Sequence, residues 1–182
     1  MTTRGDWFQT FTGIQFYPLD PRPEDIDLLD IAHALANQCR YAGHCRVFFS
    51  TAQHSIMVSR VVPGEPAIVG LLYDAAEAYC HDLTRPMKLA LRASTTAYDD
   101  IELGIERVIA KRFGLPAPPW PAAVKAADNV ALMTERRDLM AVQRVWTERA
   151  EPLPERIIPL DPLAAERAFL DRATLLCVCY YT

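Results

Sequence analysis

The chain has 182 residues, of which 51% are hydrophobic, and its formal net charge is −4 at neutral pH. This composition excludes a disordered chain and predicts one domain with a proper hydrophobic core. No dense block of lysine and arginine indicates a polynucleotide-binding face, although a few arginines suffice to bind a small anion. No apolar run approaches membrane-spanning length, and residues 1–7 do not resemble a signal peptide.

The cysteine pattern excludes two further kinds of protein. The five cysteines form no C-x-x-C pair and lie at Cys39, Cys45, Cys80, Cys177 and Cys179. An odd number of cysteines without such a pair argues against both a disulfide framework and a zinc knuckle. We therefore predict reduced thiols in a cytoplasmic protein.

The hydrophobic pattern predicts mostly helices. A weak alternation over residues 7–18, around Thr12-Gly13, indicates a small β-hairpin at the N-terminus. Residues 41–49 are expected to form a loop, and residues 82–88 a bend that contains a proline. Helices are expected, in chain order, at about 23–38, 50–61, 66–80, 97–113, 122–144 and 162–175.

These elements predict an all-α fold, a compact helical bundle with a small β appendage. We expect a single domain over residues 1–182. Its core is expected at about 25–140, with a C-terminal extension at 150–182 packed on that core.

The expected helix at 66–80 carries an unusual pair of acids. It is apolar nearly all round, which is typical of a buried helix, yet it contains Asp74 and Glu77. Positions i and i+3 share a helix face, so the two carboxylates should point into the same space. Buried carboxylates need a partner or a cation. His54 on the preceding helix and Asp128 on a later one add side chains suited to a divalent metal. The alternatives are a buried network in which Asp74 and Glu77 pair with arginines, a His54 satisfied by a backbone carbonyl, and an Asp128 that caps a turn or forms a salt bridge with Lys125.

The order of these residues resembles the HD-domain metal-dependent phosphohydrolases and, within that superfamily, the small 5′-deoxynucleotidase-like branch. The resemblance covers about residues 25–140. The stretches that carry it are Cys39-Arg40-Tyr41, Gln53-His54-Ser55, Leu71 to Tyr79, His81 to Lys88 and Ala127-Asp128.

One departure concerns the pair of residues after which the superfamily is named. The family's His-Asp pair reads Tyr73-Asp74 here, so one histidine ligand is absent. His81-Asp82 is a literal His-Asp pair, but it follows Glu77, whereas the family's pair precedes that glutamate. His81 is therefore not assigned as the missing ligand.

The resemblance implies a set of roles for the matching residues. It implies a divalent metal (cobalt, manganese, zinc, magnesium or iron) held by His54, Asp74 and Asp128, with Tyr73 in the fourth position. A neutral phenol is a poor ligand, so metal affinity should be weakened.

The remaining roles concern the substrate. Glu77 and Asp82 would be catalytic, the first orienting water or donating a proton and the second accepting a hydrogen bond from a sugar hydroxyl. Arg40 and Lys88 would bind substrate by holding phosphate charge.

The function implied by the resemblance is hydrolysis of nucleoside 5′-phosphates, with a deoxynucleoside monophosphate as first choice and a triphosphate as the variant. The partner is then a small-molecule nucleotide rather than a polynucleotide or a membrane. The resemblance also implies a homodimer, with the helix from residue 122 as candidate interface, whereas 135–138 read as a solvated face or a dimer contact. The alternatives are an HD scaffold that binds a nucleotide or protein without turnover, and a hydrolase for another phosphorylated metabolite.

Overall fold

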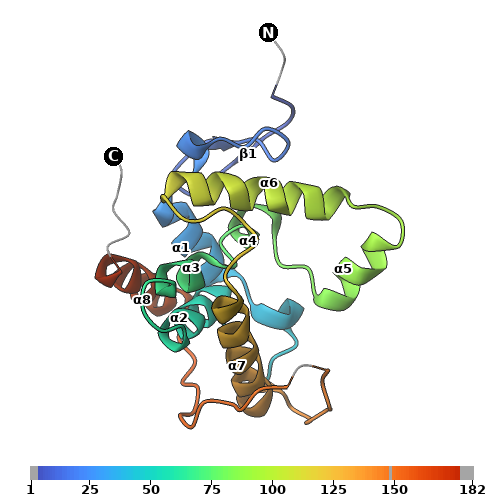
Figure 1. Cartoon of the computed structure of the whole chain (residues 1–182), viewed down its shortest axis with the longest axis vertical. Helices are drawn as coiled ribbons and strands as arrows, with labels where there is room; N and C mark the ends of the chain where they lie inside the picture. The colour runs from blue at the N-terminus through green and yellow to red at the C-terminus, as the bar shows by residue number, and fades with distance from the viewer. Residues whose placement is uncertain (1–3, 148, 177–182) are drawn as a thin grey trace.

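The computed structural model describes residues 4–147 and 149–176 and shows a mostly helical protein with a small β-hairpin near its N-terminus (Figure 1). Strand β1 (Phe8–Gln9) pairs antiparallel with β2 (Gln15–Phe16), with Phe8 opposite Phe16. Gly13 in the connecting turn has a φ of +94°, which glycine adopts without steric cost. The predicted all-α class and the predicted hairpin are both confirmed.

Polar side chains fix the starts of three helices. Asp27 Oδ1 accepts a hydrogen bond from the backbone N–H of Leu29 at 2.7 Å, and Ser50 Oγ accepts one from Gln53 at 3.1 Å. Asp161 does the same ahead of the last helix. The helices are α1 (Leu28–Asn37), α2 (Thr51–Val61), α3 (Ala67–Leu72), α4 (Glu77–Cys80), α5 (Arg85–Arg92), α6 (Ala97–Arg112), α7 (Ala122–Leu139) and α8 (Pro162–Leu175), and the short 3₁₀ helices are η1 (Pro23–Asp25) and η2 (Arg40–Gly43).

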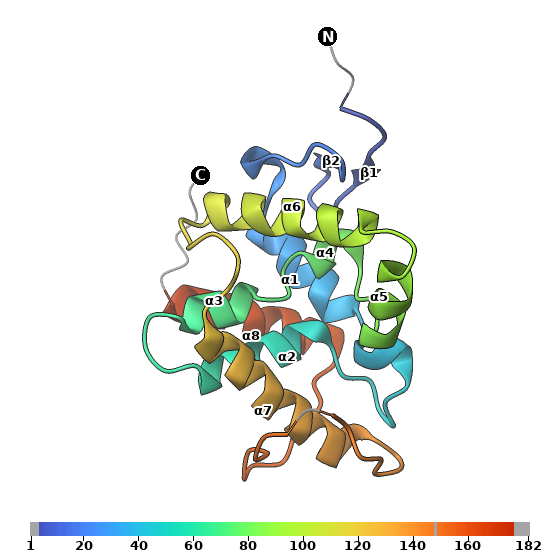
Figure 2. The same ribbon diagram turned by 45° about the vertical axis from the view of Figure 1, so that its right-hand side comes forward.

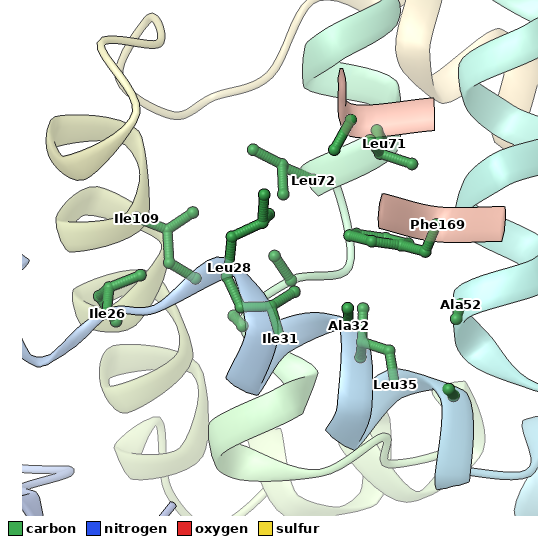
Figure 3. Close-up of a cluster of buried hydrophobic side chains, with 14 of the residues drawn as sticks. Ile26, Leu28, Ile31, Ala32, Leu35, Ala52, Leu71, Leu72, Ile109 and Phe169 are labelled. Carbon is green, nitrogen blue, oxygen red and sulfur yellow. The ribbon is translucent and has the colours of Figure 1, made fainter. Parts of the chain in front are cut away.

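Helix α2 is the centre of the packing, because it contacts α1, α3, α7 and α8 (Figures 1 and 2). The main core joins the N-terminal and C-terminal parts of the described chain. Figure 3 shows its side chains converging from several elements, among them Leu28, Ile31 and Leu35 of α1, Leu71 and Leu72 of α3, Ile109 of α6 and Phe169 of α8. Helix α8 therefore belongs to the same core as α1.

The helix expected at 66–80 is interrupted in its middle. Residues 73–76 form a tight turn between α3 and α4, in which each bond spans three residues. The N–H of Ala75 donates to the carbonyl of Leu72 at 3.1 Å, and that of Glu77 to Asp74 at 3.0 Å. In such a 3₁₀-like turn, residues i and i+3 eclipse one another. The interruption therefore brings Asp74 and Glu77 even more directly onto one side than a continuous helix does.

Three other boundaries differ from the expectation. The first long helix begins at Leu28 rather than residue 23, because Asp27 is extended and caps it. The expected bend at 82–88 contains the start of α5, whose Pro86 lies in the first turn, where its missing N–H costs nothing. Helix α7 ends at Leu139 rather than residue 144, because other groups bind its last carbonyls. The backbone N–H of Arg46 donates to the Leu139 carbonyl at 2.9 Å, and Gln143 Nε2 donates to the Arg136 carbonyl at 2.9 Å.

Two further expectations concern thiols and membranes. Cys39, Cys45 and Cys80 are free thiols, whereas Cys177 and Cys179 lie outside the described residues. In the described part of the chain, no helix combines the length and the apolar character needed to cross a membrane.

Candidate functional site

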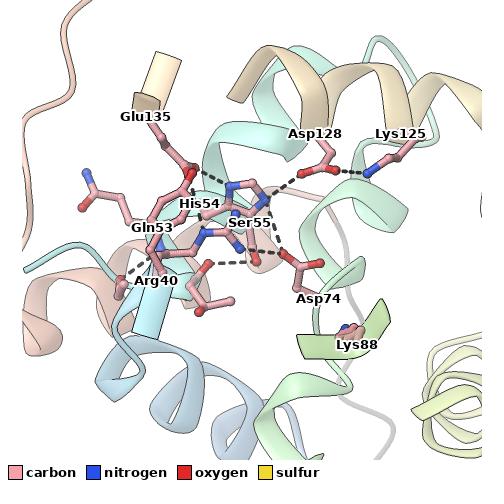
Figure 4. A network of polar contacts seen from close by, with 12 residues as sticks. Arg40, Gln53, His54, Ser55, Asp74, Lys88, Lys125, Asp128 and Glu135 are labelled. Atoms are coloured by element: carbon pink, nitrogen blue, oxygen red, sulfur yellow. Dashed lines mark hydrogen bonds and ion pairs between the residues drawn. The ribbon is translucent and has the colours of Figure 1, made fainter. Parts of the chain in front are cut away.

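His54 is the centre of a buried polar cluster (Figure 4). It lies in the first turns of α2, where the Ser50 cap fixes the helix start, and its side chain is 0% exposed. Its Nδ1 atom is hydrogen-bonded to Glu135 Oε1. Its Nε2 atom lies 3.3 Å from Asp74 Oδ2 and 3.3 Å from Asp128 Oδ1, yet makes no hydrogen bond of good geometry to the described residues. One ring nitrogen is thus anchored and the other faces two carboxylates.

Three separate elements bring this cluster together. Asp74 comes from the tight turn after α3, and Asp128 from the second turn of α7. Helix α2 packs against both α3 and α7, which places His54 between them. The structure therefore brings the three predicted metal ligands to one point.

Arg40 reaches the same point from the loop before α2. That loop is closed at its base by an isolated bridge between Cys39 and Ser50, and the Arg40 N–H donates to the Phe49 carbonyl at 2.9 Å. The buried guanidinium lies with Nη1 3.5 Å from Asp74 Oδ2 and Nε 3.5 Å from Glu135 Oε2. Arg40 is therefore an internal cation of the site.

Glu135 is the residue that sequence reasoning missed. We expected 135–138 to be a solvated face or a dimer contact, but Glu135 is 0% exposed and the Asp138 side chain only 5% exposed. Asp138 binds Arg137 and Arg156. Glu135 faces the site instead, because it follows Asp128 by two helical turns and so lies on the same face of α7. That spacing was the available signal.

The charges of the cluster shift one another's pKa values. Burial and the Arg40 charge act to lower the pKa of His54, but the carboxylates of Glu135 and Asp128 beside the ring outweigh them and raise it to about 10. Burial acts to raise the pKa of Glu135, yet Arg40 and His54 hold it below its usual value. Burial and neighbouring acids raise the pKa of Glu77 well above its usual value.

A cavity of about 770 Å³ opens beside this cluster. Its lining includes Arg40, Asp74 and Asp128 and also the other residues singled out by sequence, namely Tyr73, Glu77, Asp82 and Lys88. The Oε2 atom of Glu77 is buried and without a hydrogen bond among the described residues. Lys88 Nζ lies 2.7 Å from Glu102 Oε1 on the cavity wall. All seven predicted site residues are therefore at or beside one cavity.

His81 lies apart from the cluster. Its Nδ1 is 2.6 Å from Gln38 Nε2, and it lines a second, smaller pocket. Its backbone, with φ +67° and ψ 155°, is in a region that non-glycine residues rarely adopt. The Tyr98 hydroxyl holds this turn by donating to the His81 carbonyl at 2.6 Å. The turn leads the chain back so that Asp82 lines the main cavity.

Among the described residues, no group of three His, Cys, Asp or Glu side chains is arranged as a ready-made metal site. Each acid beside His54 also has a cationic neighbour: Arg40 on Asp74, and Lys125 Nζ at 2.5 Å from Asp128 Oδ2. Two atoms that bind one ion at about 2.0–2.2 Å lie roughly 3–3.5 Å apart, and the His54 contacts with both acids have that length. The donor atoms therefore fit a divalent cation, provided that the Arg40 and Lys125 side chains move away from Asp74 and Asp128.

Fold and site together define a mostly helical protein with a buried histidine, carboxylate and arginine cluster beside one cavity. No protein-family model matches the sequence. The chain is 39% identical over 170 residues to the uncharacterized protein YfdR of Escherichia coli (strain K12), an alignment that covers 91% of this chain and 93% of YfdR. It is 31% identical over 164 residues to an uncharacterized protein of Rhodobacter capsulatus, covering 84% and 82% of the two chains. The chain therefore belongs to the same family as YfdR.

Proposed function

We propose that this protein is an HD-type metal-dependent phosphohydrolase that acts on nucleoside 5′-phosphates, with a deoxynucleoside monophosphate as first substrate and a triphosphate as the variant. One observation carries the proposal. His54 Nε2 is buried, has no hydrogen bond to any residue that the structure describes, and faces Asp74 and Asp128, whereas Nδ1 is hydrogen-bonded to a carboxylate. Histidines that bind metals have this arrangement, with the second nitrogen held by an acceptor.

His54, Asp74 and Asp128 would hold the cation. Imidazole and carboxylate are ligands that manganese, cobalt, iron and zinc accept, and carboxylates suit magnesium. When bound, a divalent cation supplies Lewis-acid polarisation of a phosphoryl oxygen and lowers the pKa of a water.

The remaining side chains supply charge and a proton. Arg40, held inside the site, would neutralise phosphate charge with its forked donors, and Lys88 would hold further charge at the cavity wall. Burial raises the pKa of Glu77 well above its usual value, which suits this carboxyl to deliver a proton to the leaving 5′-oxygen. Asp82 would accept a hydrogen bond from a sugar hydroxyl.

Aromatic side chains on the same cavity favour a nucleotide over a smaller phosphate ester. Tyr41 and Trp146 both line it, and their ring centroids lie 5.7 Å apart at 47°. Aromatic faces beside a phosphate-binding arginine offer a platform on which a base can stack. The cavity volume of about 770 Å³ also falls within the range of pockets for drug-sized ligands.

The second candidate is a catalytically impaired scaffold that binds a nucleotide or a protein partner without turnover. Tyr73 is the observation that favours it. Burial and the nearby Asp128 and Asp74 raise the pKa of the Tyr73 phenol, which keeps it neutral and makes it a poor ligand. The proposal also includes a homodimer, which rests on the resemblance, and a location in the cytoplasm, which rests on the cysteine pattern. Light scattering after gel filtration tests the dimer.

The test of the proposed function is phosphate release. Protein supplied with excess Mn²⁺ or Co²⁺ is incubated with a panel of deoxynucleoside mono- and triphosphates. We expect release from at least one of them and a loss of roughly 100-fold or more in Glu77→Gln. The impaired scaffold predicts nucleotide binding with no release above the rate of the buffer alone. A protein that neither binds nor hydrolyses any of these nucleotides would contradict both candidates.

A further inference from the structure

Glu135 contacts three functional side chains from a fully buried position. It hydrogen-bonds His54 Nδ1 and lies 3.5 Å from Arg40 Nε (Figure 4). It also accepts a hydrogen bond from the Tyr41 hydroxyl at 2.5 Å. These partners come from α2 and from the loop before it, whereas Glu135 comes from α7. It is not part of the cavity lining, so it touches no substrate in the cavity.

The two carboxylate oxygens of Glu135 contact different parts of the site. Oε1 holds the His54 ring, which fixes the direction of Nε2 toward Asp74 and Asp128. Oε2 holds Arg40 and Tyr41, which fixes the guanidinium whose Nη1 reaches Asp74. The distance between the cation-binding nitrogen and the phosphate-binding guanidinium is thus set through one carboxylate.

We propose that Glu135 is a positioning residue that couples the metal-binding half of the site to the phosphate-binding half. The inference rests on the proposed function in that it takes His54 as a metal ligand and Arg40 as a phosphate contact. It adds a residue that neither holds the cation nor touches the substrate.

A purely structural role explains the arrangement less well. Burying a carboxylate is costly, and well-packed apolar side chains stabilise a core at least as well as a buried ion pair. Glu135 is held among three polar partners that all lead to the cavity or its ligand set. The Tyr41 backbone, at φ +56°, is in the left-handed region that few non-glycine residues adopt, and the Glu135 contact helps to hold it there.

The experiment compares Glu135→Gln and Glu135→Asp with Asp138→Asn. Asp138 is the matched control, because it is a nearly buried carboxylate three residues further along α7 that binds Arg137 and Arg156 instead of the site. Titration calorimetry measures Mn²⁺ alone and then inorganic phosphate, with thermal unfolding measured in parallel. Nuclear magnetic resonance of the metal-free proteins follows the His54 Nδ1–H proton and its exchange with water.

We expect Glu135→Gln to weaken Mn²⁺ binding by roughly 10–100-fold and also to weaken phosphate binding by about tenfold, with loss of the slowly exchanging Nδ1–H signal. Glu135→Asp should recover part of each effect, and Asp138→Asn should change each affinity by less than about twofold, whatever its effect on thermal unfolding. Equal losses in Glu135→Gln and Asp138→Asn, or unchanged affinities for both probes in Glu135→Gln, would overturn the inference. If the wild-type protein binds no Mn²⁺, the proposed function fails, and the Nδ1–H signal with phosphate binding then decides whether Glu135 positions His54 and Arg40.

Discussion

His54 Nε2 lies 3.3 Å from Asp74 Oδ2 inside the protein, although His54 belongs to α2 and Asp74 to the turn after α3. The contact depends on the tight turn at residues 73–76, which interrupts the helix expected there. The same turn directs Glu77 into the cavity beside Asp74. The interruption of the helix thus places Asp74 and Glu77, two residues of the proposed chemistry, side by side at the cavity.

Tyr73 gives the first prediction. If it occupies the position of a ligand, Tyr73→His should strengthen Mn²⁺ binding by roughly tenfold or more, since an imidazole replaces a neutral phenol beside Asp74 and Asp128. Titration calorimetry of metal-free protein measures the change. Tyr73→Phe is the control and should leave the affinity near that of the wild type. An unchanged affinity in the histidine variant would mean that Tyr73 does not stand at a ligand position.

Trp146 gives a prediction about the substrate. Trp146→Ala should weaken binding of a deoxynucleoside monophosphate by roughly 10–100-fold, because base stacking on an aromatic ring contributes about 1–3 kcal/mol. Binding of inorganic phosphate should not change. Val145→Ala is the matched control, since Val145 lines the same cavity but is 89% exposed. Parallel losses for nucleotide and phosphate would show that the ring shapes the site without contacting a base.

Much of the fold was predictable from the sequence because its helices follow regular apolar spacing. The expected helix ends at about 38, 61 and 175 lie within one residue of the observed ends at Asn37, Val61 and Leu175. The end of α7 was not predictable in this way, because the backbone N–H of Arg46, in a distant loop, donates a hydrogen bond to the Leu139 carbonyl.

The candidate site shows the same limit. His54, Asp74 and Asp128 could be chosen because their types and order suggest ligands. Glu135 stands in a run of charged residues that looks solvated, and its spacing of two helical turns from Asp128 was the only sequence signal for it. Its burial becomes evident only when α7 is packed against α2.

Glu106 gives a prediction about stability and pH. Burial and the nearby Glu102 charge raise the pKa of this cavity carboxyl to about 7. An acid whose pKa rises on folding binds its proton more tightly in the folded state, so the free energy of unfolding falls as pH rises from about 4.5 to 7. Glu106→Gln removes this loss. With partial exposure taken into account, the variant should be more stable than wild type by about 1–2 kcal/mol at pH 8 and equal to it near pH 4.5.

Urea unfolding in the presence of a chelator, at both pH values, measures the effect. Glu65→Gln serves as control because Glu65 is exposed, and it should change the free energy of unfolding little at either pH. A Glu106→Gln variant that is less stable than wild type at pH 8 would show that the carboxylate has a cationic partner there.

The cation site itself is tested most directly by titrating metal-free protein with Mn²⁺ and comparing wild type with Asp128→Asn. Asp138→Asn, which alters a carboxylate outside the site, controls for general damage to α7. We expect one Mn²⁺ per chain in wild type and in the control, and an affinity at least about tenfold weaker in Asp128→Asn. Wild-type protein that binds no Mn²⁺ at any excess, or an Asp128→Asn variant that binds it as well as wild type does, would contradict a cation site at His54, Asp74 and Asp128.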